Sequence, residues 1–223
     1  MGVEKKKYEN QFLNRLQDNA IALMKQQGAE VIELEYVDKL NALGDAEYEL
    51  MKFEFKDGLN KYLSTANANV KNIADVIAFN KTNEDKVMPT FKQENMVMSE
   101  EKAGLDSKEY KEAFEKSHVG SKKIIDAVLQ EHKLDALFGL TMGPACSIDT
   151  IYGDRWGDVF LTSPAAMSGY PHISVPCGFV YELPVGLSFF STAYKEAELI
   201  GLAYAFEQAG KHRQKPAFKK AFL

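Results

Sequence analysis

The chain has 223 residues, of which 45% are hydrophobic and 26% are charged, and its formal net charge is −5. These values are close to the average of globular proteins and supply enough apolar material for a sizeable core. A mildly acidic chain lacks the basic footprint of nucleic-acid-binding proteins, so we expect no nucleic-acid partner. The apolar runs are too short for a membrane span, so we expect no membrane partner either.

Cysteine and histidine are scarce. Cys146 and Cys177 are the only cysteines, which argues against a disulfide framework and favours a reducing, cytoplasmic compartment. The four histidines form no pair at metal-ligand spacing, so we expect no metal and no cofactor. The charged amino-terminal stretch has no apolar region after it, so no signal peptide is predicted. Lys219 and Lys220 form a short basic tail, which we interpret as solvated.

The first elements predict a helix followed by a strand. Residues 8–27 carry apolar side chains at three- and four-residue spacing, which is typical of an amphipathic helix. Gly28 suits the position after its last turn, because glycine accepts the left-handed conformation. Residues 30–37 alternate in polarity and predict a short strand. This order is typical of helices that pack on a sheet.

The middle of the chain predicts mainly helices. Residues 45–62 predict a long helix, and residues 72–79 predict a shorter one. Residues 106–133 predict a long charged helix that Gly120 interrupts. The first of these helices has one apolar face, which comprises Tyr48, Met51, Phe55, Leu59 and Tyr62.

The character of the sequence changes after residue 134. Residues 136–140 are a short apolar run and predict a strand that is buried on both faces. A loop rich in Gly, Pro and Asp follows over residues 141–158. Residues 164–168 predict a helix of small residues that ends at Gly169.

The last segments predict a hairpin and a helix. Residues 172–176 and 185–190 predict two paired strands, joined through residues 181–184. Residues 194–212 predict a final helix, for which Ser191 or Thr192 is the expected cap.

These elements predict an α/β fold, in which a mixed sheet is flanked by helices and the first half is rich in helix. We expect one domain over residues 1–223, with residues 1–133 mostly helical and residues 134–223 forming most of the sheet. The predicted strands are few for the apolar area, which suggests that further strands of the sheet are missing.

Three strings near the end of the chain resemble the closing region of the amidase signature family. They are residues 163–178 (SPAAMSGYPHISVPCG), 183–190 (LPVGLSFF) and 196–208 (EAELIGLAYAFEQ). They are similar to the family motifs A-G-x-P-x-I-x-V-P-x-G, L-P-V-G-L-x-F-F-G and E-x-L-L…A-x-A-F-E-Q. Residues 54–63 and 74–80 resemble a helical insertion in the branch that includes peptide amidases, rather than the A subunit of glutamyl-tRNA amidotransferase.

The resemblance implies hydrolysis of carbon–nitrogen bonds in a small-molecule or peptide amide. The family uses a nucleophilic Ser, a second Ser in a cis peptide and a Lys, all in its amino-terminal half. This chain has no Ser-Ser and no Gly-Gly dipeptide, so we assign no catalytic residue. We expect a carboxy-terminal fragment that is inactive alone, with Met1–Val3 as the remnant of an internal strand.

The most site-like cluster lies in the loop, at Tyr152, Asp154, Arg155, Trp156 and Asp158. In family terms this loop lies near the substrate mouth. Tyr152 and Trp156 would then line the pocket for the acyl or leaving group, and Asp158 would bind a polar end of the substrate. Alternatively, the segment is an ordered loop with a surface Asp–Arg contact. Cys177 is interpreted as a small buried hydrophobe, and His172 as a strand residue near a turn.

Two other functions stay open at this point. The chain could be a binding or assembly module that completes an enzyme with a partner chain, because an unpaired sheet edge tends to pair with a partner or with itself. It could also hold an independent activity built on the loop at residues 152–158.

Overall fold

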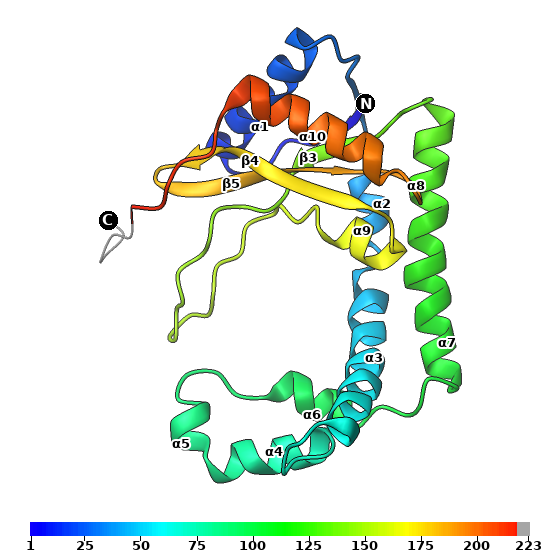
Figure 1. Cartoon of the computed structure of the whole chain (residues 1–223), viewed down its shortest axis with the longest axis vertical. Coiled ribbons are helices and arrows are strands. Elements are labelled where there is room, and N and C mark those ends of the chain that lie inside the picture. Colours follow the sequence, from blue (N-terminus) through cyan, green and yellow to red (C-terminus); the bar gives the residue numbers. More distant parts are fainter. Residues whose placement is uncertain (218–223) are drawn as a thin grey trace. The chain divides into compact units, whose positions relative to one another are not determined.

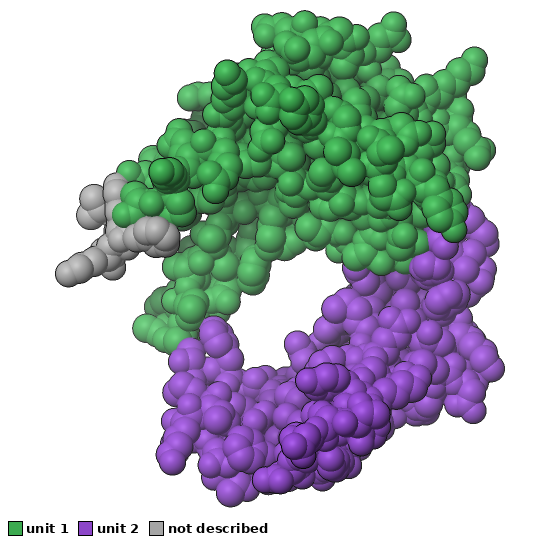
Figure 2. Space-filling model, viewed as in Figure 1, with its two compact units in different colours: residues 1–38, 124–223 green, residues 39–123 purple. Residues whose placement is uncertain are grey.

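The computed structural model describes residues 1–217, and the predicted basic tail at Lys219 and Lys220 lies outside them. The chain forms two compact units (Figure 2). Unit 1 comprises Met1–Asp38 and Ile124–Leu223, and unit 2 comprises Lys39–Lys123. That the whole chain is one domain stays a prediction.

Unit 1 is built on a mixed five-stranded sheet, as the sequence predicts (Figure 1). The sheet has the order β2-β1-β3-β5-β4. Strand β1 runs parallel to β2 and β3, whereas β5 is antiparallel to both β3 and β4. The strands are β1 (Gly2–Glu4), β2 (Ile32–Leu34), β3 (Leu137–Leu140), β4 (His172–Val180) and β5 (Leu183–Phe190).

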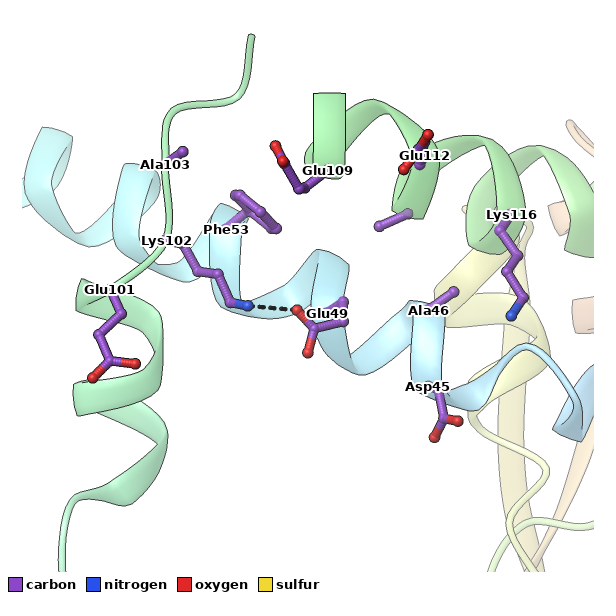
Figure 3. A pocket seen from close by; sticks show the side chains of 11 residues that line it. Asp45, Ala46, Glu49, Phe53, Glu101, Lys102, Ala103, Glu109, Glu112 and Lys116 are labelled. Atoms are coloured by element: carbon purple, nitrogen blue, oxygen red, sulfur yellow. Dashed lines mark hydrogen bonds and ion pairs between the residues drawn. The ribbon is translucent and has the colours of Figure 1, made fainter. Parts of the chain in front are cut away.

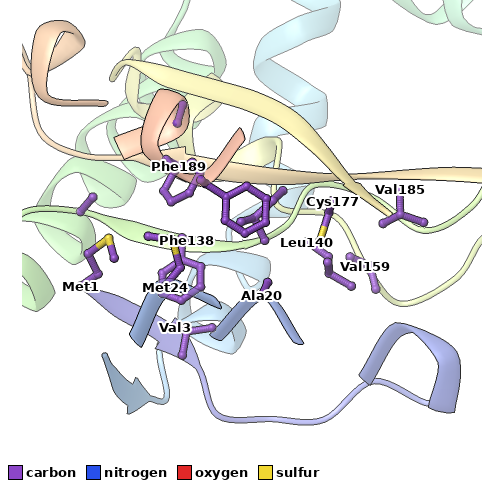
Figure 4. Close-up of a cluster of buried hydrophobic side chains, with 14 of the residues drawn as sticks. Met1, Val3, Ala20, Met24, Phe138, Leu140, Val159, Cys177, Val185 and Phe189 are labelled. Atoms are coloured by element: carbon purple, nitrogen blue, oxygen red, sulfur yellow. The ribbon is translucent and has the colours of Figure 1, made fainter. Parts of the chain in front are cut away.

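One face of the sheet carries the main hydrophobic core (Figure 4). Phe138 and Phe189 are fully buried there, with ring centroids 6.0 Å apart. Helices α1 (Gln11–Gln26) and α10 (Glu196–Gly210) contribute Met24 and Phe206 to the same cluster. Because strand side chains alternate between faces, the run at β3 must be apolar on both sides to be fully buried, and it is. The predicted doubly buried strand is therefore confirmed.

Local signals in the sequence explain the ends of several elements. Asn10 caps α1 by accepting a hydrogen bond from the Phe12 amide, and Gly28 follows the helix with a φ of 90°. Helix α9 (Ser163–Ser168) ends at Gly169 in the left-handed conformation. The β4–β5 hairpin is longer than predicted, because Val180 pairs with Leu183 and only two residues form the turn.

The predicted cap of the last helix is wrong. Helix α10 begins at Glu196, and its N-cap residue, Lys195, makes no side-chain cap hydrogen bond. The Ser191 hydroxyl instead donates to the Asp135 carbonyl, and the Thr192 hydroxyl donates to the Asp126 carboxylate. Both hydroxyls therefore link the residues that follow β5 to Asp135 and Asp126.

Unit 2 is helical, and it begins within α2 (Val37–Asn41) and ends within α8 (Gly120–Glu131). A π-helical turn over Glu115–Val119 directly precedes Gly120, where the sequence predicts an interruption. The other helices are α3 (Gly44–Thr65), α4 (Ile73–Thr82), α5 (Glu84–Val87), α6 (Glu94–Glu100) and α7 (Lys108–Phe114). Within the described residues, none of the helices is long and apolar enough to cross a membrane.

The apolar face predicted for α3 is not the face that the structure buries. The structure buries Leu50 and Phe53, whereas Met51 is 56% exposed and Tyr62 is 69% exposed. Helix α3 carries apolar residues on two faces, and it packs against α6 and α7. Periodicity alone does not distinguish two apolar faces of one helix.

Candidate functional site

A long loop leaves the sheet at the end of β3 and returns before α9. Thr141 anchors its base twice, because its amide donates to the Gly186 carbonyl at 2.8 Å and its carbonyl accepts from the Leu161 amide at 2.9 Å. Met142 and Phe160 form a single antiparallel bridge next to this anchor. The loop is therefore held on the sheet at both ends, a common arrangement for binding loops.

Two of the predicted site residues project from this loop into solvent. Tyr152 is 80% exposed and Trp156 is 59% exposed. The Trp156 ring lies 6.1 Å from the ring of Phe160. Asp149 shapes the tip, because its carboxylate accepts hydrogen bonds from the amides of Ile151 and Tyr152, which lower the pKa of Asp149.

The third predicted residue, Asp158, connects the loop to the start of α1. Its Oδ2 atom accepts a hydrogen bond of 2.9 Å from the Glu9 amide. Across residues 1–217, no hydrogen bond or ring contact joins Tyr152, Trp156 and Asp158 to one another. The alternative surface contact also differs from expectation, since Asp154 accepts from the Asp149 amide and forms no ion pair with Arg155.

A row of polar side chains crosses the sheet at the base of the loop, and we call it the hydroxyl row. His172 Nε2 lies 2.7 Å from Ser188 Oγ, and the Ser188 hydroxyl donates to Thr141 Oγ1 at 2.8 Å. Thr141 Oγ1 in turn lies 2.7 Å from Ser174 Oγ. Ser188 is fully buried and Ser174 is exposed. Burial also lowers the pKa of His172.

Sequence reasoning did not find the hydroxyl row, although a signal for it exists. In β4 the polar His172 and Ser174 alternate with Ile173 and Val175, which pack against the core. This two-residue period places both polar residues on the face opposite the core. The pairing of Ser174 with Ser188 in the register of the hairpin then brings the polar positions of two strands together.

The buried Cys177 is not a candidate nucleophile. Cys177 is 3% exposed, and burial raises the pKa of its thiol to about 12. A thiol that stays protonated is a poor nucleophile at neutral pH. Cys177 is therefore a buried hydrophobe, as predicted. In residues 1–217, no group of three His, Cys, Asp or Glu side chains is arranged to hold a metal ion.

Unit 2 contains a separate cavity of about 590 Å³ between α3, α7 and the segment after α6 (Figure 3). Its walls carry Glu49 and Lys102, whose side chains pair at 2.6 Å, and the Lys102 ammonium lies 5.3 Å from the centre of the Phe53 ring. Lys102 and Lys52 lower the pKa of Glu49. The lining residues include no hydroxyl, thiol or imidazole.

A mixed sheet flanked by helices, with an anchored and exposed loop after β3, defines an α/β protein with a loop-borne candidate site. The family model described as Amidase matches residues 5–200 of the chain. The chain therefore belongs to the amidase family, as its closing motifs predict.

Individual relatives agree with this assignment. A probable amidase of Arabidopsis thaliana is 32% identical over 210 residues, which cover 91% of this chain and 38% of the relative. The peptide amidase of Stenotrophomonas maltophilia is 35% identical with a TM-score of 0.87, over 98% of this chain and 44% of that one. A peptide amidase in complex with the competitive inhibitor chymostatin gives a TM-score of 0.90 at 35% identity, over 97% of this chain and 44% of that one. The chain thus spans less than half the length of these relatives.

Proposed function

We propose that this chain is the carboxy-terminal part of an amide-hydrolysing enzyme, and that it is inactive without a segment that supplies the nucleophilic Ser, its partner Ser and the Lys. The family match over residues 5–200 is the observation that carries the proposal. The lack of any Ser-Ser or Gly-Gly dipeptide supports the absence of the catalytic segment. The two free cysteines favour a reducing, cytoplasmic compartment.

The substrate of the complete enzyme would be a small-molecule or peptide amide. Tyr152 and Trp156 offer exposed aromatic faces for its apolar part. Asp158 uses Oδ2 to bind the Glu9 amide, whereas its Oδ1 atom makes no hydrogen bond within the described residues. That oxygen is available for a donor on the polar end of the substrate.

Turnover tests the proposal directly. The purified chain would be assayed with a panel of anilides and peptide amides, alone and mixed with the amino-terminal part of the Stenotrophomonas maltophilia peptide amidase. A fluorophosphonate probe would report any activated serine. We expect neither turnover nor labelling by the chain alone, and turnover in the mixture. Turnover by the chain alone that survives stringent purification would contradict the proposal and favour an independent activity. If the two chains formed a stable complex without turnover, the result would favour the function of an assembly module.

The loop has its own optical probe, because Trp156 is the single tryptophan of the chain. We expect a peptide amide to change the Trp156 emission saturably in the mixture. The Asp158→Asn variant should bind the same amide more weakly, while Asp154→Asn, in the same loop, should not. If the unaltered chain and both variants bound the peptide amide with equal affinity, Asp158 would not be part of the binding site.

A further inference from the structure

The hydroxyl row has a defined order of hydrogen atoms. Ser188 has one hydroxyl hydrogen, and its geometry directs that hydrogen to Thr141 Oγ1. His172 Nε2, 2.7 Å from Ser188 Oγ, must then be the donor of that contact. Within the described residues, Ser174 Oγ is the one acceptor near Thr141 Oγ1, 2.7 Å away, so we assign the Thr141 hydrogen to Ser174. The hydrogen of the exposed Ser174 hydroxyl is therefore the one left without an acceptor in the row.

The fold is built to allow this row. Thr141 follows β3 and Ser174 lies in β4, so their contact has to pass over the intervening strand β5. Gly186 is the residue of β5 at this point, and a Cβ atom there would lie 2.7 Å from Ser174 Oγ and 2.9 Å from Thr141 Oγ1. Glycine is thus the residue that lets the two hydroxyls meet above the strand.

The direction of the row decides which ligand it suits. Each hydrogen bond in such a chain polarises the next one, so the hydrogen at the free end becomes a stronger donor than that of an isolated hydroxyl. The inner end is a donor imidazole, and every hydrogen points outward toward Ser174. An oxygen that carries a full or partial negative charge completes this arrangement, whereas a cation would oppose it.

We infer that the Ser174 hydroxyl, at the exposed end of the hydroxyl row, is a binding position for an acyl oxygen, either of an amide or of a carboxylate. The inference rests on the proposed function, because that function supplies the acyl oxygen. Amide hydrolysis has an amide carbonyl in its substrate and a carboxylate in its product. Ser174 binds this oxygen directly. Thr141, Ser188 and His172 are positioning residues that act through it.

The test uses nuclear magnetic resonance of the whole chain with two small probes, acetamide and acetate, the latter matched in ionic strength with chloride. We expect a saturable shift of the Ser174 amide and of the His172 ring signals with at least one probe. Acetamide alone would identify the amide carbonyl, and acetate alone the carboxylate. The exposed His132 serves as the internal reference and should not shift.

Three variants separate the site from a general solvent effect. Ser174→Ala, at an exposed position, should abolish both shifts, whereas Ser147→Ala in the loop should preserve them. Thr141→Val removes the middle hydroxyl, so the shift at Ser174 should persist while the response of His172 is lost. Absence of a saturable shift in the unaltered chain, or equal shifts in Ser174→Ala, would overturn the inference. Neither result depends on turnover, so a failure here is distinct from a failure of the proposed function.

Discussion

The two units differ in how many large side chains they bury completely. All but two of the largest fully buried side chains lie in unit 1, the exceptions being Leu40 and Ile73. Large apolar residues that are more than half exposed occur in both units, for example Tyr62 in unit 2 and Tyr194 in unit 1. The helices of unit 2 are joined by ion pairs such as Lys102–Glu49 and Lys56–Glu100. These ion pairs are partly exposed to solvent and should contribute less to stability than fully buried rings, so the units should differ in how much a single substitution matters.

The largest effect is expected in the core of unit 1. Phe138→Ala removes a fully buried ring that packs against Phe189, and it should destabilise the protein by about 3–5 kcal/mol. Denaturant unfolding followed by circular dichroism would measure the loss. Ile200→Ala, on the exposed side of α10, is the control and should change stability by less than about 0.5 kcal/mol. Similar effects for both substitutions would mean that Phe138 does not lie in a packed core.

The second prediction tests which face of α3 is buried. Phe53→Ala should destabilise unit 2 by about 3 kcal/mol, at the lower end of the range for buried Phe, because Phe53 also borders a cavity. Phe55→Ala, two residues away and 44% exposed, should have a small effect. Proteolysis within residues 39–123 would measure the local stability. A larger loss of stability for Phe55→Ala than for Phe53→Ala would mean that the face expected from periodicity is the buried one.

Alanine substitutions at two glycines should change the stability less, and with opposite signs. Gly186→Ala forces a Cβ atom against the Thr141 and Ser174 hydroxyls and should destabilise the protein by about 1–3 kcal/mol. Gly201→Ala in α10 meets no atom within 4 Å and should stabilise the helix by about 0.5–1 kcal/mol. Thermal unfolding of both variants would show the two signs. If Gly186→Ala left the stability unchanged, the strands could move apart without a loss of stability.

The smallest effect is a pH dependence in unit 1. Burial lowers the pKa of His172 in the folded state, so the unfolded chain takes up this proton at the higher pH. The unfolding free energy should therefore fall as the pH drops below the ordinary His value of 6.5. Urea unfolding on both sides of that value would measure the slope. His172→Gln should reduce the slope, while the separate loss from Glu49 at lower pH should remain.

Much of unit 1 could be predicted from the sequence, because its elements carry strong local signals. The apolar run at β3, Gly169 after α9 and the hairpin strands each have one favoured conformation. The face of α3 could not be predicted, since Leu50 and Met51 are equally apolar and only tertiary contacts distinguish them. Propensity and pattern are overridden by packing at such positions.

The candidate site was only partly accessible to sequence reasoning. The loop that holds Tyr152, Trp156 and Asp158 was found through its composition and through the family resemblance, and its role stays a prediction. The hydroxyl row was missed because its members come from three separate segments, and a single Thr or Ser in a strand carries no pattern of its own. Only the alternation in β4 together with the strand order brings them to one place.

The position of β1 in the sheet has a consequence for the order of folding. Val3 pairs with Glu33 on one side and with Phe138 on the other. One of the two neighbours of β1 therefore lies beyond the whole of unit 2 in the chain. Unit 2 is a continuous segment and can form its helices during synthesis, whereas the sheet can close only after β3 has emerged. Until then the edge of β1 that pairs with β3 is open, and an open strand edge is prone to misassociation.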